Sequence, residues 1–249
     1  MATKPVVLIL GAGPRIGASL ATHFTTANYN IALASRRGTN SLLPSGHLSL
    51  TADLSNPSSI PSLFAAVRAH FLSPPSVVIY NAGSFTSPPS NTNVLSVPAE
   101  ALVGDLGVNT VSAYVAAQEA VKGWEEMGNG EGKGKGVFIY TGNICNVEIV
   151  PWPMMMTAGA GKAATAYWIG SVDGLMKEKG YRFFYADERF PDGKLKGAAV
   201  DGDAHGEFYV QLAKQGGGGV DGEERIPWHA TFAKGKGYMY FKKDVVGAA

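Results

Sequence analysis

The first candidate for chemistry is a glycine-rich segment near the N-terminus, LILGAGPRIGASL. It places Gly11, Gly13 and Gly17 between an apolar run and an amphipathic pattern, which predict a strand followed by a helix. Glycines at such a turn let the backbone bend sharply and approach a diphosphate, which then lies at the helix N-terminus. We therefore predict a dinucleotide site that includes Arg15 and Ile16. The alternative is an ordinary tight turn in a glycine-rich chain.

A polar and cationic cluster ends the next apolar run, NIALASRR, with Ser35, Arg36 and Arg37. An acidic residue at this place would bind both ribose hydroxyls of NAD. A hydroxyl and two guanidinium groups instead suit a 2′-phosphate through charge-assisted hydrogen bonds. We therefore predict NADP rather than NAD as the cofactor, with Arg15 leaning toward the same phosphate. The alternative is that these arginines project into solvent.

Strands and helices that would position these groups alternate along the chain. Apolar runs predict strands at 6–10, 30–36, 48–54, 76–83, 136–142, 182–188 and 237–241. Helical patterns are expected at 16–27, 58–72, 97–127 (one helix or two), 161–179 and 203–214. Strands that are apolar on both faces and alternate with helices predict a parallel sheet covered on each side. The glycine-rich segments 128–136 and 214–224 are expected to be connections, because neither separates two complete sheets.

Three further motifs follow the glycine turn in order: TADLS at 51–55, YNAG at 80–83 and GVNT at 107–110. Together they make the chain resemble the short-chain dehydrogenase/reductase family over essentially its whole length. The resemblance implies an α/β fold: a single doubly wound Rossmann-type domain, residues 1–249, with a seven-stranded parallel sheet and helices on both faces. It also implies a substrate lid at about 189–215 and a homo-oligomer, a dimer or a tetramer.

The resemblance assigns roles to individual residues. Asp53 and Leu54 would lie beside the adenine, and Asn109 would belong to the catalytic set. Lys162 would bind the nicotinamide ribose. The cofactor would also be supported from the centre of the sheet by Asn81, Ala82 and Gly83.

The catalytic part of the family pattern has changed. Ala158 stands four residues before Lys162, where the family has its catalytic tyrosine. The family's serine after the fifth strand is replaced within TGN, for which Thr141 and Asn143 are candidates, and Cys145 is near by spacing. General acid–base help of this kind is worth ~10²–10⁴-fold in rate. Hydride transfer positioned by the fold alone would persist, but slowly.

Replacement donors should lie at the carboxyl ends of the strands, where ligands bind in such sheets. Thr141 and Asn143 either hydrogen-bond a carbonyl oxygen or cap the turn. Asp187 begins a charged group after the sixth strand, in which Glu188 and Arg189 either serve the chemistry or form a structural ion pair. His205 lies in the lid segment, where packing or capping is the alternative to a functional role.

The composition excludes several classes of function. A formal charge of +1 over 249 residues, without a dense Lys/Arg block, predicts no nucleic-acid partner. The apolar runs are shorter than the ~20 residues of a membrane span, and no targeting segment is recognised. The single cysteine is typical of a reducing compartment, so a cytoplasmic protein is expected. The histidines show no metal-ligand spacing, and no metal site is predicted.

The sequence is compatible with three functions. The first is an atypical NADP(H)-dependent oxidoreductase that reduces a carbonyl or imine of a small, hydrophobic molecule. The second is an NADP(H)-binding sensor or interaction protein without turnover. The third is a non-redox lyase, isomerase or cyclase on the same fold. The sequence favours the first because the cofactor site is largely retained, and an iminium substrate would reduce the need for an acid.

Overall fold

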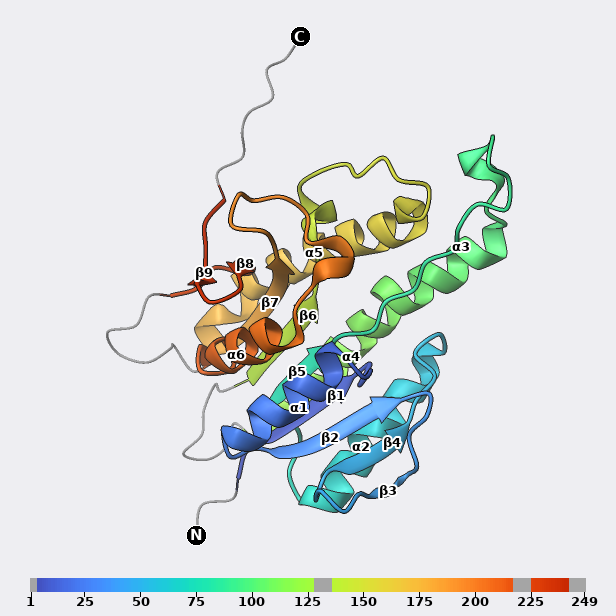
Figure 1. The fold of residues 1–249 in the computed structure, drawn as a ribbon. Helices are drawn as coiled ribbons and strands as arrows, with labels where there is room; N and C mark the ends of the chain where they lie inside the picture. Colours follow the sequence, from blue (N-terminus) through green and yellow to red (C-terminus); the bar gives the residue numbers. More distant parts are fainter. Residues whose placement is uncertain (1–3, 128–135, 217–224, 242–249) are drawn as a thin grey trace.

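The computed structural model describes residues 4–127, 136–216 and 225–241 of the chain, and Figure 1 shows a central sheet flanked by helices. The strands are β1 (Val6–Leu10), β2 (Asn30–Ser35), β3 (Ser41–Leu42), β4 (Leu48–Thr51), β5 (Val77–Tyr80), β6 (Gly136–Thr141), β7 (Tyr181–Glu188), β8 (His229–Ala233) and β9 (Gly237–Tyr238). The helices are α1 (Ile16–Thr26), α2 (Ile60–Phe71), α3 (Ala99–Leu106), α4 (Ser112–Met127), α5 (Met155–Met176) and α6 (Gly202–Ala213). A π-helical turn, Gly107–Val111, joins α3 to α4.

Short 3-10 turns complete the described elements: Pro57–Ser59, Val94–Ser96, Ile144–Asn146, Lys177–Lys179 and Gly197–Ala199. The two glycine-rich connections predicted at 128–136 and 214–224 lie largely outside the described residues. No helix in the described ranges is long and apolar enough to cross a membrane.

The sheet has the strand order β3-β4-β2-β1-β5-β6-β7-β8-β9. The pairings from β4 to β8 are all parallel, which confirms the doubly wound seven-stranded parallel sheet. Two short edge strands, β3 and β9, are added antiparallel, so the complete sheet is mixed. Edges this short expose little unpaired backbone, which limits pairing with other chains.

Two predicted boundaries were wrong. The seventh parallel strand is β8, whereas the aromatic run predicted as a strand at 237–241 contributes only β9, the return strand of a hairpin. Its aromatic residues suit a strand, but the left-handed turn at Gly235 reverses the chain before them. Helix α5 begins at Met155 rather than Gly161, because four of the six residues of 155–160 are Met or Ala, which favour a helix and outweigh Thr157 and Gly159.

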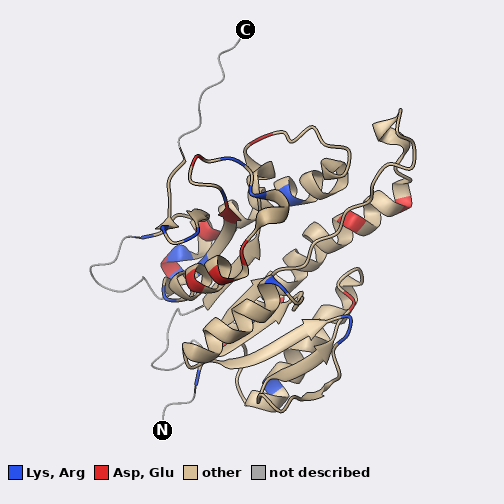
Figure 2. Cartoon of the chain, in the orientation of Figure 1, with Lys and Arg blue, Asp and Glu red and all other residues tan. Residues whose placement is uncertain are grey.

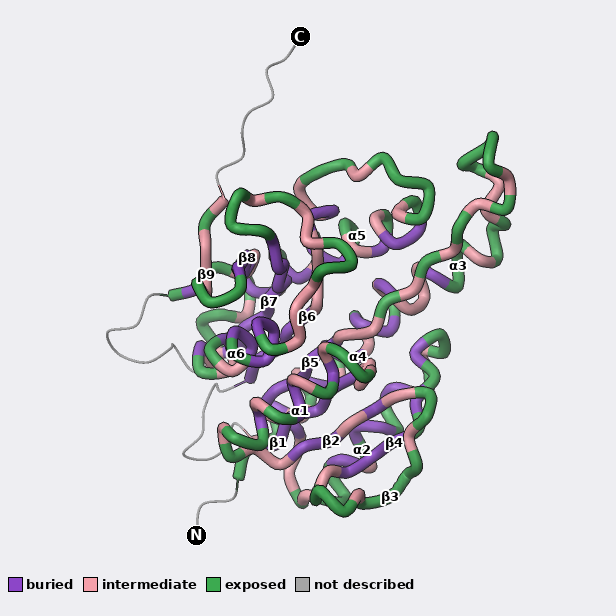
Figure 3. The backbone as a smooth tube through the Cα atoms, in the orientation of Figure 1, coloured by how far each residue is buried: buried purple, intermediate pink, exposed green. Residues whose placement is uncertain are grey.

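Side chains alternate between the two faces of the sheet, so each strand contributes to two cores. From β1, Val6, Leu8 and Leu10 pack with the buried side chains of α2, α4 and α5. Val7 and Ile9 pack on the opposite face with those of α1 and α6. Figure 3 shows the strands as the buried centre of the molecule, and helices therefore cover both faces.

The carboxyl ends of the parallel strands meet at one edge of the sheet. In register, Tyr80 of β5 pairs with Tyr140 of β6, which pairs with Tyr185 of β7. Residues that directly follow these strands are consequently brought together, although they are far apart in sequence. This edge is where ligands bind in doubly wound sheets.

Candidate cofactor and active site

A cleft of about 1120 Å³ opens at the carboxyl edge of the sheet. Its wall includes all but one of the residues predicted to bind the cofactor, and Gly17 is the exception. The predicted residues that line it are Gly11, Gly13, Arg15, Ile16, Ser35, Arg36, Arg37, Asp53, Leu54, Asn81, Ala82, Gly83 and Lys162.

The glycine turn is fixed by close backbone contacts. Gly11 has φ +91°, and a Cβ there would lie 2.5 Å from the Ala82 nitrogen, so a side chain cannot be accommodated without movement. The Asn81 amide donates to the Gly11 carbonyl at 2.9 Å and joins this turn to β5. A Cβ on Gly17 would lie 2.7 Å from the Ala12 carbonyl carbon. Gly17 therefore lets α1 pack directly against the turn, although Gly17 itself is not part of the cleft wall.

The N-terminus of α1 faces the same turn. No side chain caps it, and its first turn carries no acidic residue. Uncapped backbone N–H groups and the helix dipole make this end suited to an anion. Arg15 at this end donates to the Ala198 carbonyl at 3.0 Å, so in this structure its guanidinium holds the segment after β7 rather than pointing to Arg36.

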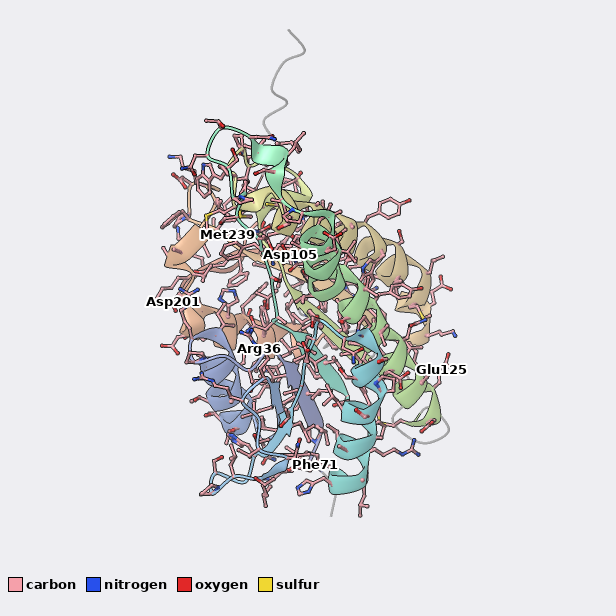
Figure 4. The ribbon with its side chains drawn as sticks, turned by 90° about the vertical axis from the view of Figure 1, so that its right-hand side faces the viewer. Arg36, Phe71, Asp105, Glu125, Asp201 and Met239 are labelled. Atoms are coloured by element: carbon pink, nitrogen blue, oxygen red, sulfur yellow. The ribbon has the colours of Figure 1, made fainter. Side chains whose placement is uncertain are left out.

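Arg36 and Arg37 are exposed at the end of β2 and line the cleft with Ser35. Figure 4 labels Arg36 near the middle of the view, below Asp105. Asp53 also lines this end, and its carboxylate accepts hydrogen bonds from the Ser55 hydroxyl at 2.7 Å and the Ser55 backbone at 3.0 Å. These bonds, with a smaller contribution from Arg36, lower the pKa of Asp53.

Lys162 and Ala158 lie one turn apart on α5. The Lys162 ammonium donates to the Thr141 carbonyl at 2.8 Å and sits 5.1 Å from the centre of the Tyr140 ring. Desolvation lowers the pKa of Lys162 to about 8, against the opposite effects of Cys145 and Asp187. Ala158 is buried, and its methyl group offers no donor to the cleft.

Asn109 lies in the π-helical turn and is fully buried. Its side-chain oxygen accepts from the Ser84 N–H at 3.0 Å, and its amide donates to the Ser84 carbonyl at 2.6 Å. Its backbone carbonyl accepts from the hydroxyls of Tyr140 and Thr165 at 2.8 and 2.9 Å. The polar groups of Asn109 are thus used within the protein, and the residue is not part of the cleft wall.

The two candidates after β6 have different surroundings. Thr141 lines the cleft, and its hydroxyl accepts a hydrogen bond from the buried Tyr209 hydroxyl at 2.9 Å. Asn143 is outside the cleft wall, and its side chain accepts from the Cys145 N–H at 3.1 Å as the cap of a 3-10 turn. Of these two, only Thr141 is placed to meet a bound molecule directly.

Charged side chains after β7 form a buried network. Asp187 is fully buried and pairs with Arg189 at 2.7 Å, while His229 approaches the same carboxylate at 3.7 Å. Arg189 therefore pairs with Asp187 rather than with Glu188, the partner considered from the sequence. Glu188 instead lies 3.2 Å from Lys196. In Figure 2 Lys, Arg, Asp and Glu gather around β7 and α6, whereas α1 and β2 are almost uncoloured.

His205 on α6 belongs to this network and not to the cleft wall. Its Nδ1 lies 2.7 Å from the Asp201 carbonyl and 3.5 Å from the Glu188 carboxylate. Burial lowers the pKa of His205 to about 4. The contacts fit the packing and capping alternative. Within the described residues, no group of three His, Cys, Asp or Glu side chains is arranged to hold a metal ion.

Comparisons with known proteins agree with this geometry. No protein-family model matches the chain. A protein named short chain dehydrogenase/reductase dmxR12, from Cryptosporiopsis sp. (strain 8999), is 36% identical over 256 residues, which cover 97% of each chain. The chain belongs to the short-chain dehydrogenase/reductase family.

Solved structures with the same fold include two reductases. The NADH-dependent reductase A1-R′ responsible for alginate metabolism superposes with a TM-score of 0.74 at 16% identity, covering 94% of this chain and 97% of that one. The NADPH-dependent 3-quinuclidinone reductase from Rhodotorula rubra gives a TM-score of 0.68 at 21% identity over 86% of each chain. These similarities support the family fold.

Three residues that the sequence did not indicate also lie at this edge. Ser84 lines the cleft, Asp105 accepts its hydroxyl, and His229 lies beside Asp187. Two signals were available for the first pair: Ser84 directly follows the YNAG motif, and Asp105 precedes Asn109 by four residues, which is one helical turn. His229 had no such signal, because its strand was not predicted.

Proposed function

We propose that this family member is an atypical NADP(H)-dependent oxidoreductase that reduces a carbonyl or imine of a small hydrophobic molecule. The observation that carries the proposal is the continuous cleft, which joins the glycine turn and Arg36 at one end to Thr141 and Lys162 at the other. Such a cleft fits an extended dinucleotide whose reactive ring lies beside Lys162.

The preference for NADP rests on Ser35, Arg36 and Arg37 in the cleft wall. Guanidinium groups bind a phosphate through paired, charge-assisted hydrogen bonds. The names of the solved relatives do not decide the question, since one is NADH-dependent and another NADPH-dependent. The residues after β2 are therefore the basis of the choice.

The chemical step divides between cofactor and protein. A reduced nicotinamide supplies the hydride. We assign Lys162 to the nicotinamide ribose, where its ammonium would orient the ring from its position at the Thr141 carbonyl. Thr141, Asn109, Asn143 and Asp187 remain proposals as catalytic groups, and only Thr141 among them lines the cleft. With Ala158 in place of an acid, the reaction is expected to be slow unless the substrate needs no proton.

A hydrophobic substrate is favoured by exposed apolar side chains near this end. The Thr86 N–H donates to Thr157 at 3.1 Å, which brings the segment after β5 against the start of α5. The large apolar residues exposed on these two segments and on the connection before α5 are Phe85, Ile149, Trp152, Met154 and Met156. Methionine and aromatic side chains adapt to flat or irregular apolar molecules.

Calorimetric titration with NADPH and NADH tests the cofactor assignment. We expect NADPH to bind more tightly than NADH, and Arg36→Ala to weaken NADPH binding by about 10- to 100-fold, as for the loss of a hydrogen bond to a charged group. The binding of NADH should change little. Arg68→Ala is the matched control, because Arg68 is exposed on α2 and pairs with Glu126. Failure of the unaltered protein to bind either nucleotide would refute the proposal.

A second candidate is an NADP(H)-binding sensor or interaction protein. Ala158 and the binding of the Asn109 side chain to the Ser84 backbone favour it, because both lower the catalytic capacity of the cleft. Tight NADPH binding without oxidation of NADPH by any carbonyl or imine, together with capture of a partner only in the NADPH-loaded form, would favour this candidate.

A further inference from the structure

A buried carboxylate lies directly behind the cleft wall. Asp105 on α3 is only 4% exposed, and its Oδ1 accepts a hydrogen bond from the Ser84 hydroxyl. Ser84 lines the cleft together with Lys162. Figure 4 labels Asp105 on α3, above Arg36 in that view. Asn109, which binds the Ser84 backbone, packs against Gly161, the residue before Lys162, so we assign the pair to the catalytic end of the cleft.

Ser84 is held in place by its neighbours in the protein. Both of its backbone groups are bound by the Asn109 side chain, at 3.0 and 2.6 Å. Two residues later, the hydrogen bond from Thr86 to Thr157 fixes this segment against α5 immediately before Ala158. The position of Ser84 is thus set by contacts within the protein, in a segment that lies against the start of α5.

The direction of the hydrogen bond determines what Ser84 offers to the cleft. A serine hydroxyl has one proton and two lone pairs. Asp105, as an ionised carboxylate, accepts only, so the Ser84 proton points toward Asp105. Toward the cleft, the Ser84 oxygen can therefore only accept. A ketone oxygen has no proton to donate to it, whereas the N–H of a protonated imine does.

The charge of Asp105 favours the same partner. Burial raises the pKa of Asp105, but hydrogen bonding from Ser84 and the hydroxyls of Thr157 and Thr86 outweighs it and leaves the pKa below the ordinary value. Only Ser84 forms a bond of good geometry to the carboxylate, and Oδ2 has no such partner in the described part of the chain. A carboxylate of low pKa is a poor acid and a poor base near neutrality. It does stabilise a nearby positive charge.

We propose that Ser84 and Asp105 form a recognition site for the N–H of a protonated imine, so that the molecule reduced in this cleft is an iminium ion. This inference rests on the proposed reductase function and names its substrate class.

The hydride of the reduced nicotinamide adds to the iminium carbon, and the C=N π pair becomes the nitrogen lone pair. The products are a neutral amine and the oxidised cofactor. No proton is transferred, so the reaction does not need an acidic side chain at position 158, where this chain has Ala158. Ser84 contacts the substrate, and Asp105 is a positioning residue that acts through it.

The test compares two probes of the same shape: dihydroisoquinoline, a cyclic imine, and tetralone, a ketone. The NADPH-loaded protein should reduce the imine in preference to the ketone, with a kcat/KM that rises as the pH falls and more imine is protonated. Ser84→Ala and Asp105→Asn should each lower the imine-to-ketone ratio of kcat/KM by about 10²-fold, the size expected for one preorganised electrostatic contact. Ser84→Thr, which keeps the hydroxyl, should restore most of the ratio.

Controls separate recognition from folding. Glu125→Gln removes an exposed carboxylate at the far end of α4 and should leave the ratio unchanged. The melting temperature and the NADPH affinity of Asp105→Asn should remain close to those of the unaltered protein. A purely structural role would lower both and reduce the two probe activities in parallel, which would overturn the proposal.

The outcomes distinguish this inference from the function on which it rests. Absence of NADPH binding would refute the reductase function itself. NADPH binding with tetralone reduced as well as dihydroisoquinoline would overturn the iminium assignment alone. NADPH binding with neither probe reduced would overturn the iminium assignment and count toward the sensor candidate. Asp105-dependent oxidation of tetralol by NADP would also overturn it, because the pair would then act as a base toward an O–H group.

Discussion

The two ends of the cleft are built by different means. At the glycine turn the wall is main chain, held by contacts that leave no room for a Cβ on Gly11. At the other end the wall depends on side chains that bind one another, such as Ser84 with Asp105 and Thr141 with Tyr209. A main-chain site can be changed only by moving the backbone, whereas a side-chain network can be rebuilt residue by residue. The proposed retention of the cofactor turn and the proposed change of the catalytic residues fit this difference.

The largest expected effect on stability comes from breaking the buried network of charged side chains after β7. Asp187→Asn would leave Arg189 buried without its charged partner, since their side chains are 0% and 7% exposed. Loss of one member of a buried ion pair typically destabilises a protein by about 3–5 kcal/mol. Urea unfolding should show a loss of this size. The double variant Asp187→Leu, Arg189→Met should recover most of it, because neither charge then remains buried.

The same variant separates a structural from a catalytic role for Asp187. If Asp187→Asn changed stability by less than about 1 kcal/mol but abolished turnover, the network would be part of the chemistry. The side-chain end of the cleft would then have to be extended to include β7.

The next prediction tests the main-chain end. Gly11→Ala would place a methyl group 2.5 Å from the Ala82 nitrogen at a φ of +91°. Clash and backbone strain together should cost about 3 kcal/mol, or roughly 6–12 °C in melting temperature. Gly13→Ala is the matched control, because a Cβ at Gly13 meets nothing within 4 Å. Equal melting temperatures for the two variants would contradict the assignment of Gly11 to a backbone contact.

The same distinction explains how much the sequence could predict. The parallel sheet and the glycine turn follow from apolar runs and glycine spacing, which act locally. The Ser84–Asp105 pair joins residues on two separate elements, so its formation depends on how α3 packs against the end of β5. The sequence predicts an alanine, Ala158, at the position of the family's tyrosine, but it gives no sign that a buried carboxylate binds Ser84 in the cleft wall.

Asn143 and His229 illustrate the same limit. Asn143 has the right spacing for a donor, yet the 3-10 turn after β6 uses its side chain as a cap. The sequence predicts no strand around His229, because a glycine-rich segment and a proline precede it and weaken the strand pattern. Register across the sheet sets His229 opposite Tyr185, and from there its ring reaches to 3.7 Å from the Asp187 carboxylate.

A third prediction uses pH to test the buried ammonium of Lys162, at the side-chain end of the cleft. The pKa of Lys162 is about 8 in the folded protein and lies below its ordinary value of 10.5. Between these values the unfolded chain binds more protons than the folded one, so unfolding free energy rises with pH. From pH ~7 to ~9.5 the gain relative to Lys162→Met should be about 1–2 kcal/mol. Urea unfolding of both proteins at the two pH values measures it. An equal change in the unfolding free energy of the unaltered protein and of Lys162→Met would contradict a buried ammonium at Lys162.

The smallest expected effect concerns Arg15, a side chain at the main-chain end. Arg15 is exposed and donates one hydrogen bond to the Ala198 carbonyl, so Arg15→Ala should change the stability of the nucleotide-free protein by at most about 1 kcal/mol. To reach a phosphate, its guanidinium would have to give up that bond. We therefore expect less than a tenfold loss of NADPH affinity, well below the effect of Arg36→Ala. Calorimetry on the two variants gives the comparison. Equal losses of NADPH affinity in the two variants would mean that a side chain of the glycine turn, Arg15, also binds the cofactor. The contrast between a main-chain end and a side-chain end would then hold only for Gly11 and its backbone contacts.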